Sequence, residues 1–189
     1  MRTITLIYDG TFNTYRWLKA MMWARNEFHD LGYKIKYASI FDYVPYPKST
    51  KVPYEGIKLK WDTIGRFDIV FLAFHHSQSL IGQNSEKRIA LVKFLKQKCK
   101  LLCWLDTADS TGTCLFDVLP YVDLYFKKQL LKDTNLYTNE FYCARLYSDY
   151  YHQKLGLTDE SLASIHYHTA LKEYLHKLRV SWNVAFYDR

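Results

Sequence analysis

Three short apolar runs, each followed at once by polar loop residues, constrain the fold of this chain most strongly. The runs are Thr3–Tyr8, Asp68–Phe74 and Cys99–Leu105. A strand that is apolar along nearly its whole length suits a parallel sheet covered on both faces. Because the carboxyl ends of parallel strands meet at one edge of a sheet, the loops after these runs should lie together. Ligands of open α/β sheets bind at that edge.

Helical patterns separate the strands, and this alternation indicates right-handed crossovers. We therefore predict an α/β fold, a Rossmann-like three-layer sandwich with a mostly parallel sheet. Asn13 or Thr14 is expected to begin the first helix, and Gly32 stands where a C-cap glycine belongs. The remaining predicted elements are the helix Asn13–Leu31, a strand Tyr33–Ile40, a helix from Asn84 or Ser85 to Lys98, and a strand Val122–Phe126.

The rest of the chain is expected to be less regular until its C-terminal part. Three prolines between Phe41 and Glu55 predict a loop. A capping pattern at Thr158 and apolar residues at helical spacing through Leu178 predict a C-terminal amphipathic helix. The run Arg179–Phe186 predicts either a final strand or, over residues 179–189, a connector to a second domain. At 189 residues the whole chain, 1–189, suits a single domain.

The charge balance favours anionic partners. The formal net charge is +7 and the sequence pI is about 9.1. Lysines cluster at spacings of one to four residues, which is typical of a solvated surface. These lysines are Lys93, Lys96, Lys98 and Lys100, and then Lys127, Lys128 and Lys132.

The four cysteines form no C-x-x-C pair and are interpreted as reduced thiols of the core or loops. Reduced thiols indicate a cytoplasmic protein. The N-terminal apolar run is too short for a signal peptide, and no stretch is long enough for a membrane span.

The loops after the three apolar runs supply the candidate site. His75, His76 and Asp106 are the candidate catalytic residues, because imidazole and carboxylate groups can act as general bases. The other candidates would bind substrate through carboxylate, hydroxyl and backbone groups. They are Asp9, Gly10, Thr11, Ser77, Asp109, Ser110, Thr111 and Gly112.

Two simpler interpretations stay open for these residues. Asp9 and Asp106 would then only cap their own turns, and the histidines would be satisfied polar residues. In an extended segment adjacent side chains point to opposite sides, so at most one of His75 and His76 is expected to face the site.

Neither a metal ion nor a cofactor is expected. Asp106 and Asp109 are three residues apart, which in an extended loop would not put both carboxylates on one side. His166 and His168 would point about 200° apart on a helix, so they could not share a metal ion. His152 and His176 are likewise interpreted as surface residues. No phosphate-binding or dinucleotide-binding glycine motif is present.

Four segments resemble the N-terminal half of glycosyltransferase-like proteins encoded in bacterial polysaccharide gene clusters. The resemblance covers roughly Asp68–Asn183, and its segments are Trp104–Gly112, Leu119–Gln129, Arg145–His152 and Val180–Asn183. It implies a GT-B glycosyltransferase, in which two Rossmann-like domains face a cleft. In that architecture the N-terminal domain binds the acceptor and often supplies the base, and the C-terminal domain binds the nucleotide sugar, commonly without a metal ion.

For this chain the resemblance implies the acceptor-binding half of such an enzyme. Its partners would be a nucleotide sugar, a glycan or lipid-linked acceptor, and a second domain or partner subunit, with peripheral contact to the membrane. The chain departs from the pattern because no room is left after Asn183 for donor-binding residues. We therefore expect a truncated or split enzyme, an enzyme that acts with a partner, or a protein whose activity is lost. The alternative is a non-catalytic α/β module that binds a protein or nucleotide. Nucleic-acid binding is disfavoured, because the aromatic residues lie mostly in predicted core strands and helices.

Overall fold

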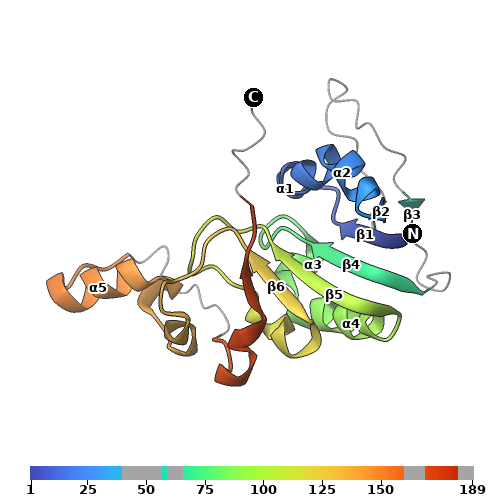
Figure 1. Cartoon of the computed structure of the whole chain (residues 1–189). Coiled ribbons are helices and arrows are strands. Elements are labelled where there is room, and N and C mark those ends of the chain that lie inside the picture. Colours follow the sequence, from blue (N-terminus) through green and yellow to red (C-terminus); the bar gives the residue numbers. More distant parts are fainter. Residues whose placement is uncertain (40–56, 59–65, 160–168, 183–189) are drawn as a thin grey trace.

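The computed structural model describes residues 1–39, 57–58, 66–159 and 169–182, and these form a Rossmann-like α/β fold (Figure 1). Seven strands form one sheet in the order β3-β2-β1-β4-β5-β6-β7, and every pairing is parallel. The predicted fold class is therefore confirmed. The strands are β1 (Arg2–Tyr8), β2 (Tyr33–Ser39), β3 (Ile57–Lys58), β4 (Phe67–Ala73), β5 (Cys99–Asp106), β6 (Leu124–Lys127) and β7 (Leu178–Val180).

The strand order reverses between β1 and β4. From β1 the chain first builds outward through β2 to β3, and it then returns to place β4 on the other side of β1. In parallel sheets such a switch point leaves a crevice at the carboxyl ends of the two central strands. The turns after β1 and β4 are therefore the favoured position for a ligand site.

Helices pack on both faces of the sheet. Ile4 and Leu6 of β1 are buried against Trp17 and Leu18 of α1 (Phe12–Trp23). On the opposite face, alternate residues of β4 and β5 pack against α3 (Leu80–Gln83) and α4 (Ser85–Lys96). The alternation of side chains gives the central strands β4 and β5 two apolar faces, as the sequence indicates, whereas Lys34 and Lys36 leave one face of β2 exposed.

The helix ends follow from local capping. Thr11 is the N-cap residue of α1, because its side chain accepts the N–H of Thr14. The helix therefore begins slightly before the predicted cap at Asn13 or Thr14. Asn84 caps α4 through the N–H of Lys87, as predicted. The predicted first helix is divided at Ala24, after which α2 (Arg25–Asp30) continues to Gly32, whose φ of +84° suits glycine.

The C-terminal part differs from the prediction. The helix expected from Thr158 to Leu178 is not confirmed, because Lys172–Lys177 form the 3-10 helix η5. The Nζ atom of Lys177 donates to the carbonyl oxygens of Leu119 and Val122, which fixes η5 against the end of η2 (Phe116–Tyr121). Of the predicted final run, Arg179 and Val180 belong to β7, a true sheet strand. The expected loop Phe41–Glu55 and residues 160–168 and 183–189 lie outside the described residues.

Several further elements were not predicted. The helix α5 (Leu146–Leu155) and the short helices η3 (Thr134–Thr138) and η4 (Tyr142–Ala144) lie between β6 and β7. The residues that the structure describes contain no helix with both the length and the apolar character needed to cross a bilayer.

Candidate functional site

The turns after β1 and β4 are joined by the carboxylate of Asp9. Its Oδ2 atom accepts the backbone N–H of His75 at 2.6 Å, and its Oδ1 atom accepts the N–H of Thr11 at 2.9 Å. The prediction that these two loops lie together is therefore confirmed. The simpler interpretation of Asp9 is confirmed as well, because this carboxylate caps its own turn. Gly10, between Asp9 and Thr11, has a φ of +76°, a conformation that favours glycine.

His75 and His76 lie on the same side of their turn, contrary to the expectation that only one would face the site. Their rings stack with centroids 4.7 Å apart and planes 25° from parallel. The segment is not extended, because the chain turns and the N–H of Ser79 bonds to the carbonyl oxygen of His75 at 3.3 Å. Adjacent side chains diverge only where the backbone is extended.

The ring of His75 is fixed by polar neighbours at both nitrogens. The Nδ1 atom lies 3.2 Å from the Ser77 Oγ atom and accepts the Ser77 backbone N–H at 3.3 Å. The Nε2 atom lies 3.4 Å from the Asn13 side-chain nitrogen, which also donates to Gln78. Sequence reasoning missed Asn13 as a site residue, although its place in the first turn of the helix after β1 could have indicated it.

Burial keeps both imidazoles in the neutral form. It lowers the pKa of His75 below its ordinary value of 6.5, although the carboxylate of Asp9 opposes this change. Burial also lowers the pKa of His76, and the neighbouring His75 adds to the effect. Within the described part of the chain the Nδ1 atom of His76 is buried without a hydrogen-bond partner. A neutral imidazole can accept a proton from a bound ligand, but for His76 this requires the other ring nitrogen, Nε2, because Nδ1 is buried.

The backbone of α3 packs directly on the histidine turn. A Cβ atom added at Gly82 would lie 1.9 Å from the carbonyl oxygen of His75 and 2.9 Å from the Cα atom of His76. Only glycine allows this close approach. Gly82 therefore determines where the two rings lie, and the sequence contained no motif that indicated it.

The loop after β5 lies beside the histidine turn. The hydroxyl of Thr107 is 3.5 Å from the carbonyl oxygen of Phe74, the last residue before His75. All three predicted loops thus meet at one edge of the sheet, as the parallel topology requires.

Asp106 does not face this edge, and its predicted role as a catalytic base is corrected. The residue is 2% exposed. Its Oδ1 atom accepts the Ala108 N–H at 2.8 Å, and its Oδ2 atom accepts the Tyr125 hydroxyl at 2.5 Å and lies 3.2 Å from the Lys127 Nζ atom. A carboxylate whose two oxygens are already bonded within the core cannot reach a ligand. The simpler interpretation, that Asp106 caps its own turn, is confirmed.

Lys127 is fully buried, contrary to the expectation of a solvated lysine cluster. Besides Asp106, its Nζ atom donates to the carbonyl oxygens of Ala108 at 3.3 Å and Thr113 at 2.7 Å. The Tyr137 hydroxyl donates to the Thr111 carbonyl oxygen at 3.0 Å. Buried side chains therefore hold both ends and the middle of the loop 107–113 from the core side.

The outer part of this loop is accessible. Asp109 is exposed, and its carboxylate pairs with Lys128 at 3.1 Å. Ser110 accepts the Gly112 N–H at 3.2 Å, and Thr111 is half-buried beside them. These candidate substrate-binding residues lie on the loop next to the histidine turn. The backbone of this loop is fixed from the core side by the hydrogen bonds of Lys127 and Tyr137.

Metal ligation has little support in the described residues. No group of three His, Cys, Asp or Glu side chains there is arranged to hold a metal ion. His152 and His176 bond to the carbonyl oxygens of Leu157 and Glu173, and His166 and His168 lie outside the described residues.

The cysteines are free thiols, and three of the four are buried. Burial raises the pKa of Cys99 to about 11 and that of Cys103 to about 12, so neither thiol is ionised near neutral pH. Nucleophilic chemistry therefore has no support from these two residues.

No family model, curated protein or solved structure matches this chain.

Proposed function

We propose that this chain binds the acceptor of a sugar-transfer reaction, as the acceptor-side domain of a GT-B-like glycosyltransferase. The observation that carries the proposal is the stacked pair His75 and His76 at the switch point of a parallel sheet, where burial lowers the pKa of both rings. Ligands bind at such switch points, and neutral imidazoles there can accept protons from hydroxyl groups.

The proposed chemistry assigns different roles to the two rings. His76 takes the proton of an acceptor hydroxyl at its Nε2 atom, because its Nδ1 atom is buried. That oxygen then forms a bond to the anomeric carbon of the sugar, and the nucleotide diphosphate leaves with the electron pair of the broken bond. His75, fixed by Ser77 and Asn13, is a positioning residue for the neighbouring ring.

The remaining candidates support the acceptor. Ser110 and Thr111 would bind sugar hydroxyls from the adjacent loop, and Asp106 acts only through that loop as a positioning residue. In this proposal the nucleotide sugar binds outside residues 1–189, on a second domain or a partner subunit, and these residues bind the acceptor.

One observation favours a second candidate, a non-catalytic binding module. All three predicted carboxylates already serve structural bonds: Asp9 to two backbone N–H groups, Asp106 to Lys127 and Asp109 to Lys128. Only the two histidines are then left for chemistry, and a binding module would not depend on them.

Saturation-transfer NMR with a panel of octyl glycosides tests the proposal. The unmodified chain should give transfer to the sugar protons of at least one glycoside, and His75→Gln and His76→Gln should each abolish it. His176→Gln is the matched control, because this histidine is exposed and its ring bonds to the carbonyl oxygen of Glu173 on η5. The proposal fails if no glycoside binds or if both site variants bind as the unmodified chain does. Binding of uridine diphosphate instead, unaffected by the histidine variants, would favour the binding module.

A further inference from the structure

The helix α5 turns its polar side toward the protein and its aromatic side toward solvent. On the inner side, the His152 ring stacks on Tyr142 with centroids 3.9 Å apart, and the Asp149 Oδ1 atom accepts the Tyr142 N–H at 3.0 Å. None of its ten residues is buried. In a helix on the surface of a globular protein the apolar side normally faces the core, so this distribution is inverted.

The outer side of α5 is a continuous aromatic and aliphatic surface. It consists of two rows spaced four residues apart, which are neighbours on a helix. The first row contains Leu146 and Tyr150, and the second contains Tyr147, Tyr151 and Leu155. These five side chains are between 37% and 59% exposed. We call this surface the outer face of α5.

Two cations lie on the same outer face. The Lys154 Nζ atom donates to the Tyr150 hydroxyl at 2.7 Å and lies 5.1 Å from the centre of its ring. The Arg145 guanidinium donates to the Tyr147 hydroxyl at 2.7 Å and lies over its ring. The one carboxylate of the helix, Asp149, faces inward and also accepts the Gln153 side-chain N–H at 2.6 Å. The outer face therefore carries positive charge and no carboxylate.

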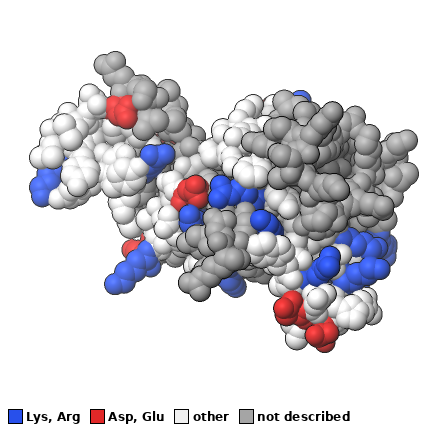
Figure 2. Space-filling model, turned by 90° about the horizontal axis from the view of Figure 1, so that it is seen from above, with Lys and Arg blue, Asp and Glu red and all other residues white. Residues whose placement is uncertain are grey.

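The position of α5 leaves this face open. The helix projects from the body of the molecule on the side of the carboxyl ends of the strands (Figure 1). In Figure 2 the described surface at that end is mostly uncharged, with Lys and Arg at its margin and one acidic patch. A single exposed helix can lie flat on a membrane surface through such a face.

We infer that the outer face of α5 docks on the surface of an anionic membrane. Tyrosine rings suit the headgroup region, because they combine an apolar body with a polar tip. Arg145 and Lys154 complement anionic headgroups, and the net charge of +7 attracts the whole chain to such a surface. This inference does not depend on the proposed function. If both hold, α5 places the carboxyl edge of the sheet beside the bilayer.

Sedimentation of the full chain with phospholipid vesicles tests the inference. Vesicles of phosphatidylglycerol and phosphatidylcholine should bind the chain, and vesicles of phosphatidylcholine alone should bind it far less. Lys154→Glu changes the charge by two units, and each unit near the membrane changes the affinity about fivefold. The variant should therefore bind about 25-fold more weakly. Tyr150→Ser combined with Tyr151→Ser should weaken it about tenfold or more, because two aromatic rings no longer enter the interface.

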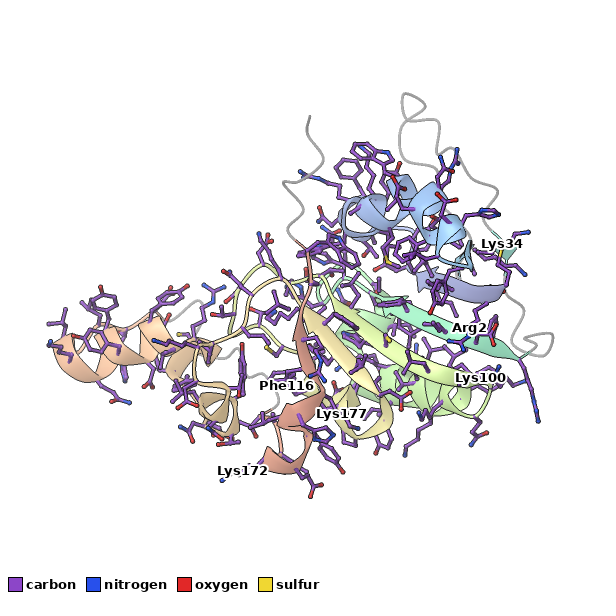
Figure 3. The ribbon with its side chains drawn as sticks, in the orientation of Figure 1. Arg2, Lys34, Lys100, Phe116, Lys172 and Lys177 are labelled. Atoms are coloured by element: carbon purple, nitrogen blue, oxygen red, sulfur yellow. The ribbon has the colours of Figure 1, made fainter. Side chains whose placement is uncertain are left out.

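Two control variants separate the effect of α5 from the effect of any surface lysine and of any exposed aromatic residue. Lys34→Glu makes the same charge change at the amino edge of the sheet, near Arg2 and Lys100 and far from α5 (Figure 3). It should change binding less than about twofold, because salt screens charges more than about 8 Å from the contact. Trp23→Ser removes an exposed aromatic ring that also lies under a lysine, Lys19 at 4.8 Å, and should leave binding unchanged.

Circular dichroism melting curves establish that each variant is folded before its binding is compared. The inference is overturned if anionic vesicles do not bind the chain, or if the α5 variants bind no more weakly than the controls. It is also overturned if the outer face of α5 instead produces concentration-dependent self-association, or binding of a protein, without any effect on lipid binding.

Discussion

Replacing Lys127 by methionine should destabilise the protein strongly, although this lysine belongs to a cluster that the sequence suggests is solvated. Methionine keeps a similar unbranched chain but removes the charge and all three donors. The variant leaves the Asp106 carboxylate buried with only the Tyr125 hydroxyl and the Ala108 N–H, and it leaves the Thr113 carbonyl oxygen without its 2.7 Å bond.

The magnitude follows from the burial of both partners. Lys127 and Asp106 have side-chain exposures of 0% and 2%. Removing one member of such a pair costs about 3–5 kcal/mol. Because a domain of this kind is stable by about 5–15 kcal/mol in total, Lys127→Met should remain folded but should unfold at a much lower urea concentration.

Urea unfolding followed by tryptophan fluorescence measures this change, and the neighbouring lysine supplies the control. Lys128 pairs with Asp109, whose side chain is 82% exposed, so Lys128→Met should cost less than about 1 kcal/mol. Asp106→Asn keeps acceptors for Tyr125 and Ala108 without the charge. Combined with Lys127→Met, it should recover about 2 kcal/mol relative to the sum of the single variants. Equal costs for the two lysines, or strict additivity of the double variant, would refute the buried ion pair as the support of the loop 107–113.

Three further predictions concern the histidine turn and the thiols. Because burial lowers the pKa of His75 and His76 from 6.5, the unfolded chain binds more protons than the folded chain just below that pH. The contribution of the two histidines to the free energy of unfolding should therefore be complete above about pH 6.5 and decrease as the pH falls below it. Urea midpoints of the unmodified chain and of a double variant, His75→Gln with His76→Gln, at about pH 7.5 and about pH 5.5 measure this contribution. A pH dependence that the variant retains in full would contradict it. Gly82→Ala should cost about 1–3 kcal/mol and move the imidazole NMR signals, since its Cβ atom would lie 1.9 Å from the His75 carbonyl oxygen; unchanged spectra would show that α3 does not position the rings. Cys99 and Cys103 should react with an aromatic disulfide reagent at pH 8 only after denaturation, because the raised pKa values of about 11 and about 12 keep both thiols protonated; rapid labelling of the folded chain would be inconsistent with this.

The sequence predicted which loops lie at the carboxyl edge of the sheet, but it did not predict the roles of their residues. An apolar run followed by a polar loop indicates a buried parallel strand and its exit, so Asp9, His75 and Thr107 could be placed at one edge. Whether a carboxylate there faces the ligand or the core depends on its partners. For Asp106 these are Tyr125 and Lys127, about 20 residues further along the chain.

The sequence by itself determined the alternation of strands and helices, the parallel sheet and the start of α4 at Asn84, because apolar periodicity and capping are local properties of neighbouring residues. Only the tertiary structure decided that Lys127 is buried, that Gly82 lies against His75 and that the aromatic side of α5 faces outward. The burial of Lys127 depends on Asp106, which lies 21 residues earlier in the chain, and the Gly82 contact depends on how the turn after β4 folds back on α3. Apolar periodicity and capping patterns carry no information about such packing. The C-terminal part shows the same limit, since the apolar spacing around Tyr174 suits an α-helix while docking on η2 and β6 holds it as a 3-10 turn and a strand.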